Sequence, residues 1–292
     1  MKKIALATML AVVSIAASAQ ATVYGNLRGF VDNTEVGTVS STSMVSDSSR
    51  FGITALEKLA GGVTARATVE TSLAVTNPAG AAASKIGDRQ STVGLASSMG
   101  SIDLGRAFNS HFLAITNNDA FGTLYGSIAG DVHNVRTVRS GDAVFVNTTA
   151  GPATISLDRT VTAGTETTTY SVAGNMGPVN ATVAVFDSGS AKSTVYAGRA
   201  KIRNLQMFAS HSVDKDSATE SSGTLVGAAM AVGNSPVTVK ASYGIKSVGN
   251  VKAYNVGADY ALSKRTAISV AYRNVNATTD TKQMGVGLTT QF

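Results

Sequence analysis

The last ten residues, Gln283 to Phe292, read QMGVGLTTQF, and this stretch decides the fold. Counting back from Phe292, every second residue belongs to an apolar-leaning face, and the alternate residues are glycine, glutamine or threonine. Such period-two alternation is typical of a β-strand with one face toward a nonpolar phase. A strand that closes a membrane-embedded barrel meets hydrocarbon outside and water inside. This stretch therefore predicts an all-β fold, a transmembrane antiparallel β-barrel.

The N-terminal residues have the pattern of a secretory signal peptide. Two lysines precede an uncharged run from Ile4 to Ile15, and a small-x-small cleavage site ends at Ala19. A second site of the same kind ends at Ala21, so the mature chain is expected to begin at Gln20 or Thr22. We therefore predict a signal peptide over residues 1–19 and an exported barrel domain over residues 20–292.

Composition excludes several classes of protein. The chain has 292 residues, with 29 glycines, four prolines, no cysteine and no tryptophan. Without cysteine it forms no disulfide and no cysteine-based metal site. After the signal peptide, no apolar run approaches the about 18 residues that a spanning helix needs. The formal net charge is +6, and no run of five like charges occurs. We therefore expect neither transmembrane helices nor a nucleic-acid partner.

Alternating stretches of about ten residues recur along the chain, which matches the length of a tilted membrane-crossing strand. The sixteen expected strands span residues 22–33, 48–58, 62–73, 85–97, 100–107, 136–148, 151–159, 165–175, 178–187, 192–202, 204–214, 220–232, 236–247, 250–262, 265–275 and 280–292. Their connections are short and long in turn, as expected for tight periplasmic turns and longer outer loops. An even number of strands closes the sheet without an unpaired edge.

The alternation also predicts which side chains point into the barrel. In the stretch 62–73, Arg66 and Glu70 share the polar face. An arginine or lysine at mid-membrane on the lipid face costs about 2–4 kcal/mol, so the basic residues are predicted to point inward. Tyrosines on the opposite faces are candidates for the aromatic girdles at the membrane interfaces. These tyrosines are Tyr243, Tyr254, Tyr260 and Tyr272.

One connection, residues 107–135, differs from the others. It runs for about 29 residues without sustained alternation. It contains three phenylalanines and several aliphatic residues, too much apolar surface for a loop that lies free outside the membrane. Loops of this length are usually functional. We expect this third long loop to fold inward against the barrel wall.

Short motifs occur in a fixed order from the start of the mature chain to its end. They are Val23-Tyr24-Gly25, SRFGI at 49–53, EKLAGG at 57–62 with Ala65 and Glu70, Asp88-Arg89-Gln90 with Val93-Gly94-Leu95, GSIDLGR at 100–106, DYALSKRT at 259–266 and the terminal Phe292. Together they resemble the Gram-negative general-diffusion porin family of the betaproteobacterial type. The resemblance implies a sixteen-stranded outer-membrane barrel, usually trimeric, whose third loop narrows the pore.

The resemblance also implies a set of site residues. Basic residues of the wall face the inward loop in this family, and members of this type tend to favour anions. The candidate pore-lining and constriction residues are Arg50, Arg66, Glu70, Arg89, Arg139, Asp119 and Asp131. Arg66 comes from strand parity rather than from a motif. If the arginines instead pair with carboxylates such as Glu70, little net field remains. One departure is Ala107 after the Gly-Arg pair, where the family usually has glutamine.

We therefore predict a passive outer-membrane porin for small hydrophilic solutes and ions, weakly anion-selective, without a cofactor. Opposed charges across the pore set a transverse field that biases the sign of passing ions. The expected partners are outer-membrane lipid, lipopolysaccharide and the solutes themselves, with a homotrimeric assembly. A solute-selective channel is the first alternative.

An outer-membrane enzyme and a barrel anchor are further alternatives. The enzyme hypothesis predicts an activity lost on changing His111 or His133. However, the three histidines lie in no metal-binding or nucleophile motif. The anchor hypothesis would require large outer loops, and most of the expected loops are short.

Overall fold

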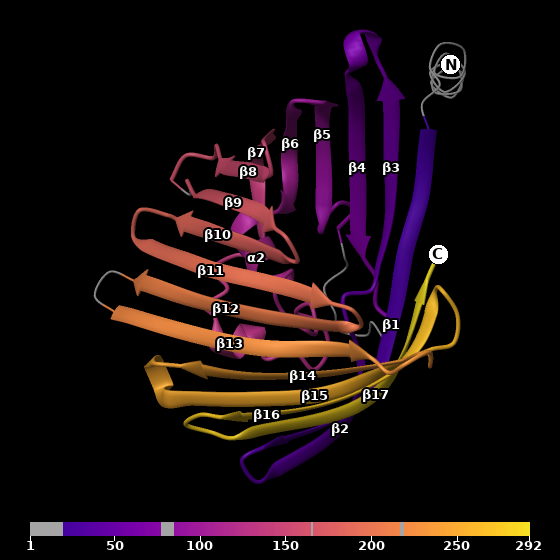
Figure 1. The fold of residues 1–292 in the computed structure, drawn as a ribbon, viewed down its shortest axis with the longest axis vertical. Helices are drawn as coiled ribbons and strands as arrows, with labels where there is room; N and C mark the ends of the chain where they lie inside the picture. Colours follow the sequence, from indigo (N-terminus) through magenta and orange to yellow (C-terminus); the bar gives the residue numbers. More distant parts are fainter. Residues whose placement is uncertain (1–19, 77–84, 165, 217–218) are drawn as a thin grey trace, which may run out of the picture.

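The computed structural model describes residues 20–76, 85–164, 166–216 and 219–292, and the expected signal peptide lies outside the described residues. These residues form one antiparallel sheet that curls around a central space (Figure 1). The strands are β1 (Gln20–Val36), β2 (Val39–Ser46), β3 (Arg50–Lys58), β4 (Thr64–Ser72), β5 (Gln90–Ser97), β6 (Gly100–Phe108), β7 (Arg139–Ala150), β8 (Ala153–Thr160), β9 (Thr168–Met176), β10 (Val179–Asp187), β11 (Ala191–Ile202), β12 (Leu205–Asp216), β13 (Thr219–Ala231), β14 (Val237–Lys246), β15 (Val251–Ala261), β16 (Thr266–Asn276) and β17 (Thr281–Gln291). Apart from β2 and β3, which both pair with β1, strands that are consecutive in the sequence pair with each other. Among the helices in the described ranges, none has the length and apolarity needed to cross a membrane.

The seventeen strand segments make sixteen barrel strands, as the sequence predicts. β2 and β3 pair with successive parts of β1: Ser46 lies opposite Gly29, and Arg50 lies opposite Asn26. The two segments therefore continue one another along one edge of β1. The other edge of β1 pairs with β17 over eleven residues, from Asn26 to Val36, and this pairing closes the barrel.

The segment β2 corrects the sequence-based boundaries. Residues 39–46 lie outside the expected strands, in the connection between the stretches 22–33 and 48–58. In the structure they pair with the far part of β1, which supplies the backbone hydrogen bonds that the side chains do not predict. The strand is interrupted between β2 and β3, where Ser48 has a φ of 52°. This interruption places Asp47 beside the barrel interior.

The outer surface follows the predicted alternation. Large apolar side chains on the outward faces are widely exposed along the whole sheet. Tyr243, Tyr254 and Tyr260 are exposed among them, and Tyr272 packs against Tyr254 with ring centroids 6.1 Å apart. Contact with lipid hydrocarbon stabilises such an apolar surface, whereas contact with water would not.

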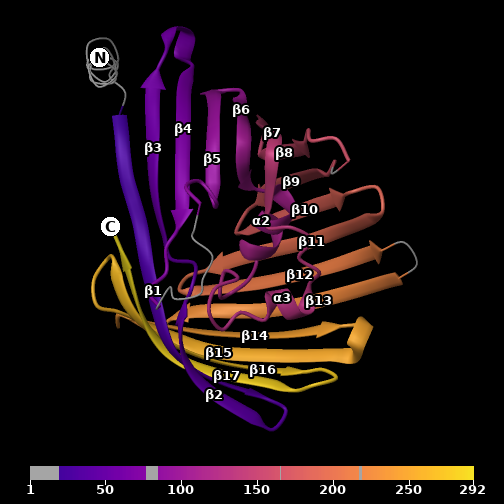
Figure 2. The same ribbon diagram turned by 180° about the vertical axis from the view of Figure 1, so that it is seen from behind.

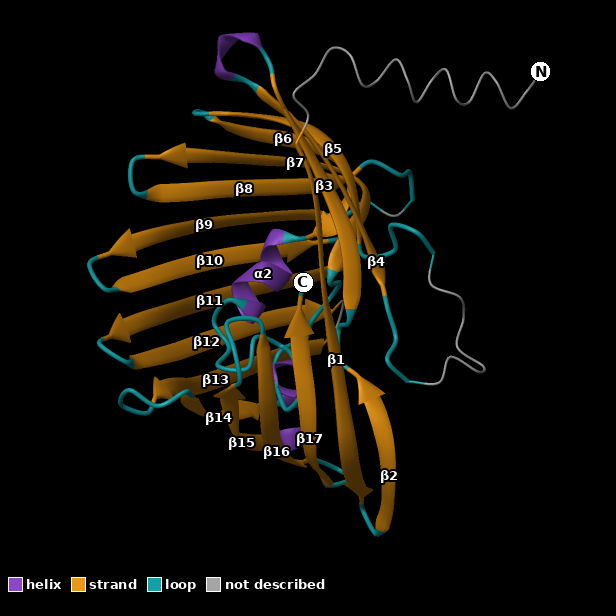
Figure 3. Cartoon of the chain, turned by 90° about the vertical axis from the view of Figure 1, so that its right-hand side faces the viewer, coloured by secondary structure: helices purple, strands orange, loops and turns teal. Residues whose placement is uncertain are grey.

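The chain between β6 and β7, residues 109–138, is called the inward loop below. It contains the helices α2 (Ser110–Thr116) and α3 (Ala129–Val132), and Figure 3 shows α2 inside the barrel. α2 lies against β8–β11 and α3 against β13–β15, as the view from behind also shows (Figure 2). The main buried cluster of the protein lies in this contact. Its members are Ala114, Ile115, Ile128, Ala129 and Val132 of the loop with Ala184, Val195, Leu225, Ala253 and Val275 of the wall.

Candidate functional site

A buried carboxylate holds the start of α2 against the wall. Asp158 of β8 accepts hydrogen bonds from the backbone N–H of Ser110 at 3.1 Å and from the Ser140 hydroxyl at 2.7 Å. The hydroxyls of Ser110 and Thr169 also donate to Asp158. The first turn is completed by Asn109, whose side chain accepts from the N–H of Phe112. These bonds fix the point where the inward loop leaves the wall.

Two histidines anchor the loop further along. His111 is buried with its Nε2 atom 2.8 Å from the Ser193 hydroxyl. The ring nitrogens of His133 lie 3.0 Å from the hydroxyl of Ser212 and 2.8 Å from that of Ser210. Burial lowers the pKa of both histidines to about 4, so both are neutral at pH 7. No group of three or more potential metal ligands occurs within the described ranges.

Charged groups hold the remainder of the inward loop. Arg136 binds Asp216 of β12 at 2.6 Å. Asp131 binds Arg273 of β16 at 3.0 Å, and burial raises the pKa of Asp131 against the opposing effect of Arg273. Lys246 of β14 donates to the side-chain oxygen of Asn134 at 2.6 Å. The loop is thus attached to widely separated strands and has a defined position in the barrel.

Tyr125 attaches the loop to the opposite side of the barrel. Its hydroxyl donates to Asp32 of β1, and its backbone N–H donates to Asp47 at 3.1 Å. Its ring stacks on Phe30 of β1, with centroids 4.0 Å apart. These contacts bring the loop across the lumen to β1, so the space on either side of it becomes narrower.

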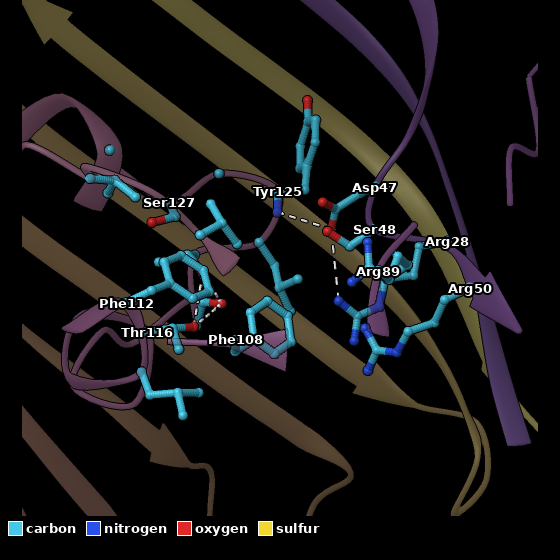
Figure 4. A pocket seen from close by; sticks show the side chains of 18 of the residues that line it. Arg28, Asp47, Ser48, Arg50, Arg89, Phe108, Phe112, Thr116, Tyr125 and Ser127 are labelled. Carbon is cyan, nitrogen blue, oxygen red and sulfur yellow. Dashed lines mark hydrogen bonds and ion pairs between the residues drawn. The ribbon is translucent and has the colours of Figure 1, made fainter. Parts of the chain in front are cut away.

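A cavity of about 720 Å³ lies between the inward loop and the arginine-bearing part of the wall. Its arginines are Arg28, Arg50, Arg89, Arg139 and Arg273. Its loop residues include Phe112, Leu113, Thr116, Leu124 and Asp131. Figure 4 shows Arg28, Arg50 and Arg89 across the cavity from Phe112 and Thr116. Residues far apart in the sequence therefore form one water-accessible passage with two chemically different sides.

Carboxylates offset some of the arginine charge. Glu70 of β4 lies between Arg50 at 3.4 Å and Arg89 at 2.7 Å. Arg28 lies 3.8 Å from Asp47.

Arg139 differs from the other arginines. Its guanidinium lies 4.2 Å from the centroid of the Phe108 ring and forms no ion pair with the carboxylates that the structure describes. With Asp131 on Arg273, five guanidinium groups meet three carboxylates, which leaves an excess of two positive charges at the cavity. The arrangement can attract anions.

The structure separates the residues that the sequence grouped together. Arg50, Arg89, Arg139 and Asp131 line the cavity, and Glu70 lies behind two of these arginines. The other two candidates lie elsewhere, for different reasons.

Arg66 forms an ion pair with Asp103 and lines a second cavity of about 360 Å³, which shares Phe108 and Leu113 with the first. Asp119 is buried within the loop, where its carboxylate accepts from the Ser127 hydroxyl at 2.6 Å and from the N–H of Thr123 at 2.8 Å. Asp119 therefore stabilises the loop rather than facing the arginines.

Three charged residues of the cavity lining were absent from the sequence-based set. Strand parity could have found Arg28 and Arg273, since both share inward faces with other polar residues. Asp47 had no such signal, because its position depends on the interruption between β2 and β3.

Comparisons with known proteins agree with this architecture. A family model described as Gram-negative porin matches residues 5–280. No curated protein matches the sequence. Among solved structures, an anion-selective porin from Comamonas acidovorans has a TM-score of 0.77 at 18% identity, covering 94% of this chain and 100% of that one.

Two further structures are similar at lower identity. The trimer form of the outer-membrane protein OmpT of Vibrio cholerae has a TM-score of 0.74 at 13% identity, covering 94% of this chain and 99% of that one. OmpF of Salmonella typhi in complex with daunomycin has a TM-score of 0.73 at 16% identity, covering 93% of this chain and 97% of that one. These similarities extend over nearly the whole chain and concern the barrel fold.

Proposed function

Because this chain belongs to the Gram-negative porin family and is an outer-membrane barrel channel, we propose that it passes small hydrophilic solutes passively and favours anions weakly. The observation that carries the proposal is the excess of guanidinium groups at the cavity, with Arg139 free of any ion pair in the described part of the chain. Family and fold indicate a channel rather than an enzyme.

The proposed mechanism is electrostatic. Guanidinium groups of the wall attract an entering anion, while Asp131 on the inward loop contributes the opposite charge across the passage. The resulting transverse field orients dipolar solutes and raises the local concentration of anions. Glu70 and Asp47 reduce the field, which is consistent with a weak rather than a strong preference.

The proposal includes the maturation and surroundings of the protein. The signal peptide is cleaved after Ala19 or Ala21, and the mature barrel lies in outer-membrane lipid with lipopolysaccharide. It assembles as a homotrimer, an inference supported by the similar barrel that is described in a trimer form. Residues 107–135 act as the constriction loop, which the position of α2 inside the barrel supports.

Reversal potentials in a KCl gradient test the selectivity. The refolded full-length mature protein is inserted in a planar bilayer and compared with the double variant Arg50→Ala/Arg89→Ala. We expect native channels to conduct in steps and to favour chloride. We expect the variant to lose at least about threefold in the chloride-to-potassium permeability ratio, because two nearby charges are removed.

The matched control is Lys264→Ala/Arg265→Ala. It removes the same charge from an exposed turn between β15 and β16, which is not part of the cavity lining. An unchanged reversal potential in the cavity variant would show that these arginines do not set the selectivity.

A further inference from the structure

One side of the cavity is apolar, which simple ion conduction does not explain. Helix α2 buries His111, Ala114 and Ile115 against the wall. Its other face presents Phe112 and Leu113 to the cavity, and Leu113 is 37% exposed. Chloride and other small hydrated ions gain nothing from such a surface. Apolar side chains in a water-filled passage can instead contact a solute that has an apolar part.

The apolar surface has an aromatic centre. The rings of Phe108 and Phe112 stack with centroids 5.3 Å apart, and both residues line the cavity. The Arg139 guanidinium lies 4.2 Å from the centroid of Phe108. A positive charge and aromatic faces therefore meet at one point of the cavity. Offset stacking against such faces favours a flat ring over an aliphatic group of similar size.

Arg139 of the cavity lining retains unused hydrogen-bond donors. Its guanidinium forms no ion pair and donates no hydrogen bond within the described chain, and of its three nitrogens only Nε is buried. A guanidinium group with free donors is suited to a carboxylate, which accepts two parallel hydrogen bonds. The same cavity thus offers donors for a carboxylate and an aromatic surface for a ring.

We propose that this cavity is a subsite for small aromatic carboxylates of about the size of benzoate. The inference rests on the proposed anion channel and names a class of solute for it. The carboxylate binds the guanidinium donors near Arg139, and the ring packs against Phe108 and Phe112. Binding is weak enough for release, as passage through a channel requires.

Current block by matched anions tests the proposal. Native mature protein in a planar bilayer carries KCl current while potassium benzoate, cyclohexanecarboxylate or acetate is added. We expect benzoate to halve the current at a concentration about tenfold below that for acetate. Benzoate contacts both the guanidinium donors and the aromatic surface of the cavity, whereas acetate has no ring. Equal half-blocking concentrations for benzoate and acetate would overturn the subsite. Equal values for benzoate and cyclohexanecarboxylate would overturn its aromatic specificity.

Variants of α2 locate the effect. In the native channel the half-blocking concentration of acetate is expected to be about ten times that of benzoate. In Phe112→Ser this ratio should fall to about two, because the contact with the ring is lost. Phe112→Leu should give an intermediate ratio. Asn117→Ser, at the exposed end of the same helix, is the control and retains the ratio near ten. A ratio near ten in Phe112→Ser would refute the assignment. Heat-dependent mobility on gels checks that each variant forms a barrel.

The reversal potential separates this proposal from the one on which it rests. A native channel without chloride preference that still distinguishes benzoate from acetate would refute weak anion selectivity and support the subsite. A chloride-preferring channel that blocks equally with both anions would refute only the subsite.

Discussion

Two parts of the inner wall have the same strand alternation and different environments. On β1, β3 and β7, inward positions carry arginines that face the water-accessible cavity. On β11, β12 and β13, corresponding positions carry Ser193, Ser210, Ser212 and Leu225, and the inward loop covers them. An inward-facing residue in this barrel is therefore exposed to water or buried, depending on where the loop lies.

The covered wall accepts the loop because its side chains are small. A Cβ atom on Gly223 would lie 2.1 Å from the carbonyl oxygen of Val132, so only glycine permits the observed approach. Serine hydroxyls there form hydrogen bonds with both ring nitrogens of His133 and with the Nε2 atom of His111. Arginines at these positions would be deprived of water without a compensating charge, at a large cost in free energy. The composition of each wall thus matches its contact with water or with the loop.

The strongest test of the comparison removes the main polar anchor of the covered wall. In Asp158→Ala, the N–H of Ser110 and three hydroxyl groups lose their acceptor. We expect α2 to lose about 4 kcal/mol of attachment free energy. Open-channel current noise and protease cleavage within residues 109–138 should both increase. The control Asp187→Ala removes an exposed carboxylate at the end of β10. Quiet, protease-resistant Asp158→Ala channels would contradict the anchoring role.

Low pH should weaken the attachment of the inward loop to the covered wall, where His111 and His133 lie. The folded pKa of His111 and His133 is about 4, below the ordinary value of 6.5, so the detached loop binds more protons than the attached one between these values. The free energy of attachment of the inward loop is therefore most favourable above about pH 6.5 and becomes less favourable as the pH falls toward 4. At pH 5 the loss is about 2 kcal/mol per histidine.

Hydrogen exchange of the loop in detergent micelles measures this effect. After correction for the intrinsic exchange rate, protection of residues 109–138 should fall at least about tenfold from pH 7 to pH 5, whereas that of β15 and β16 should not. Constant loop protection over this range would exclude the histidines as neutral anchors. His133→Gln should remove about half of the dependence, since His111 still titrates.

A change on the exposed wall should alter selectivity rather than loop attachment. Glu70→Gln removes the carboxylate between Arg50 and Arg89. We expect the chloride-to-potassium permeability ratio to rise about two- to threefold, because both guanidinium groups lose a compensating charge. Reversal potentials in a KCl gradient measure the ratio, and loop protection serves as the control. A lower ratio would show that Glu70 does not offset these arginines.

The smallest effect is expected for Arg66→Gln. Arg66 and its partner Asp103 line the adjoining cavity and not the main one, so both the charge removed and the carboxylate freed lie outside the lining of the main cavity. We expect the permeability ratio to change by less than about 1.5-fold. A change as large as that of Arg50→Ala/Arg89→Ala would mean that ions pass mainly on the Arg66 side of the loop.

The sequence by itself determined the barrel. Period-two alternation identified all sixteen barrel strands and their inward faces, because a residue that points to lipid and one that points to water must differ in polarity. The absence of alternation marked the inward loop, and the family resemblance indicated Arg50 and Arg89 through motifs and Arg139 through its place on the strand after the loop. These are local properties, which neighbouring residues in the chain reveal.

Only the tertiary structure decided which inward residues act together. The loop buries Asp119 in its own hydrogen bonds, and Asp103 pairs with Arg66 in the adjoining cavity. Asp47 reaches the arginines only because β2 and β3 are interrupted beside β1. Strand alternation specifies a direction for each side chain, but the partner it meets depends on segments far away in sequence, whose positions follow from packing across the whole barrel.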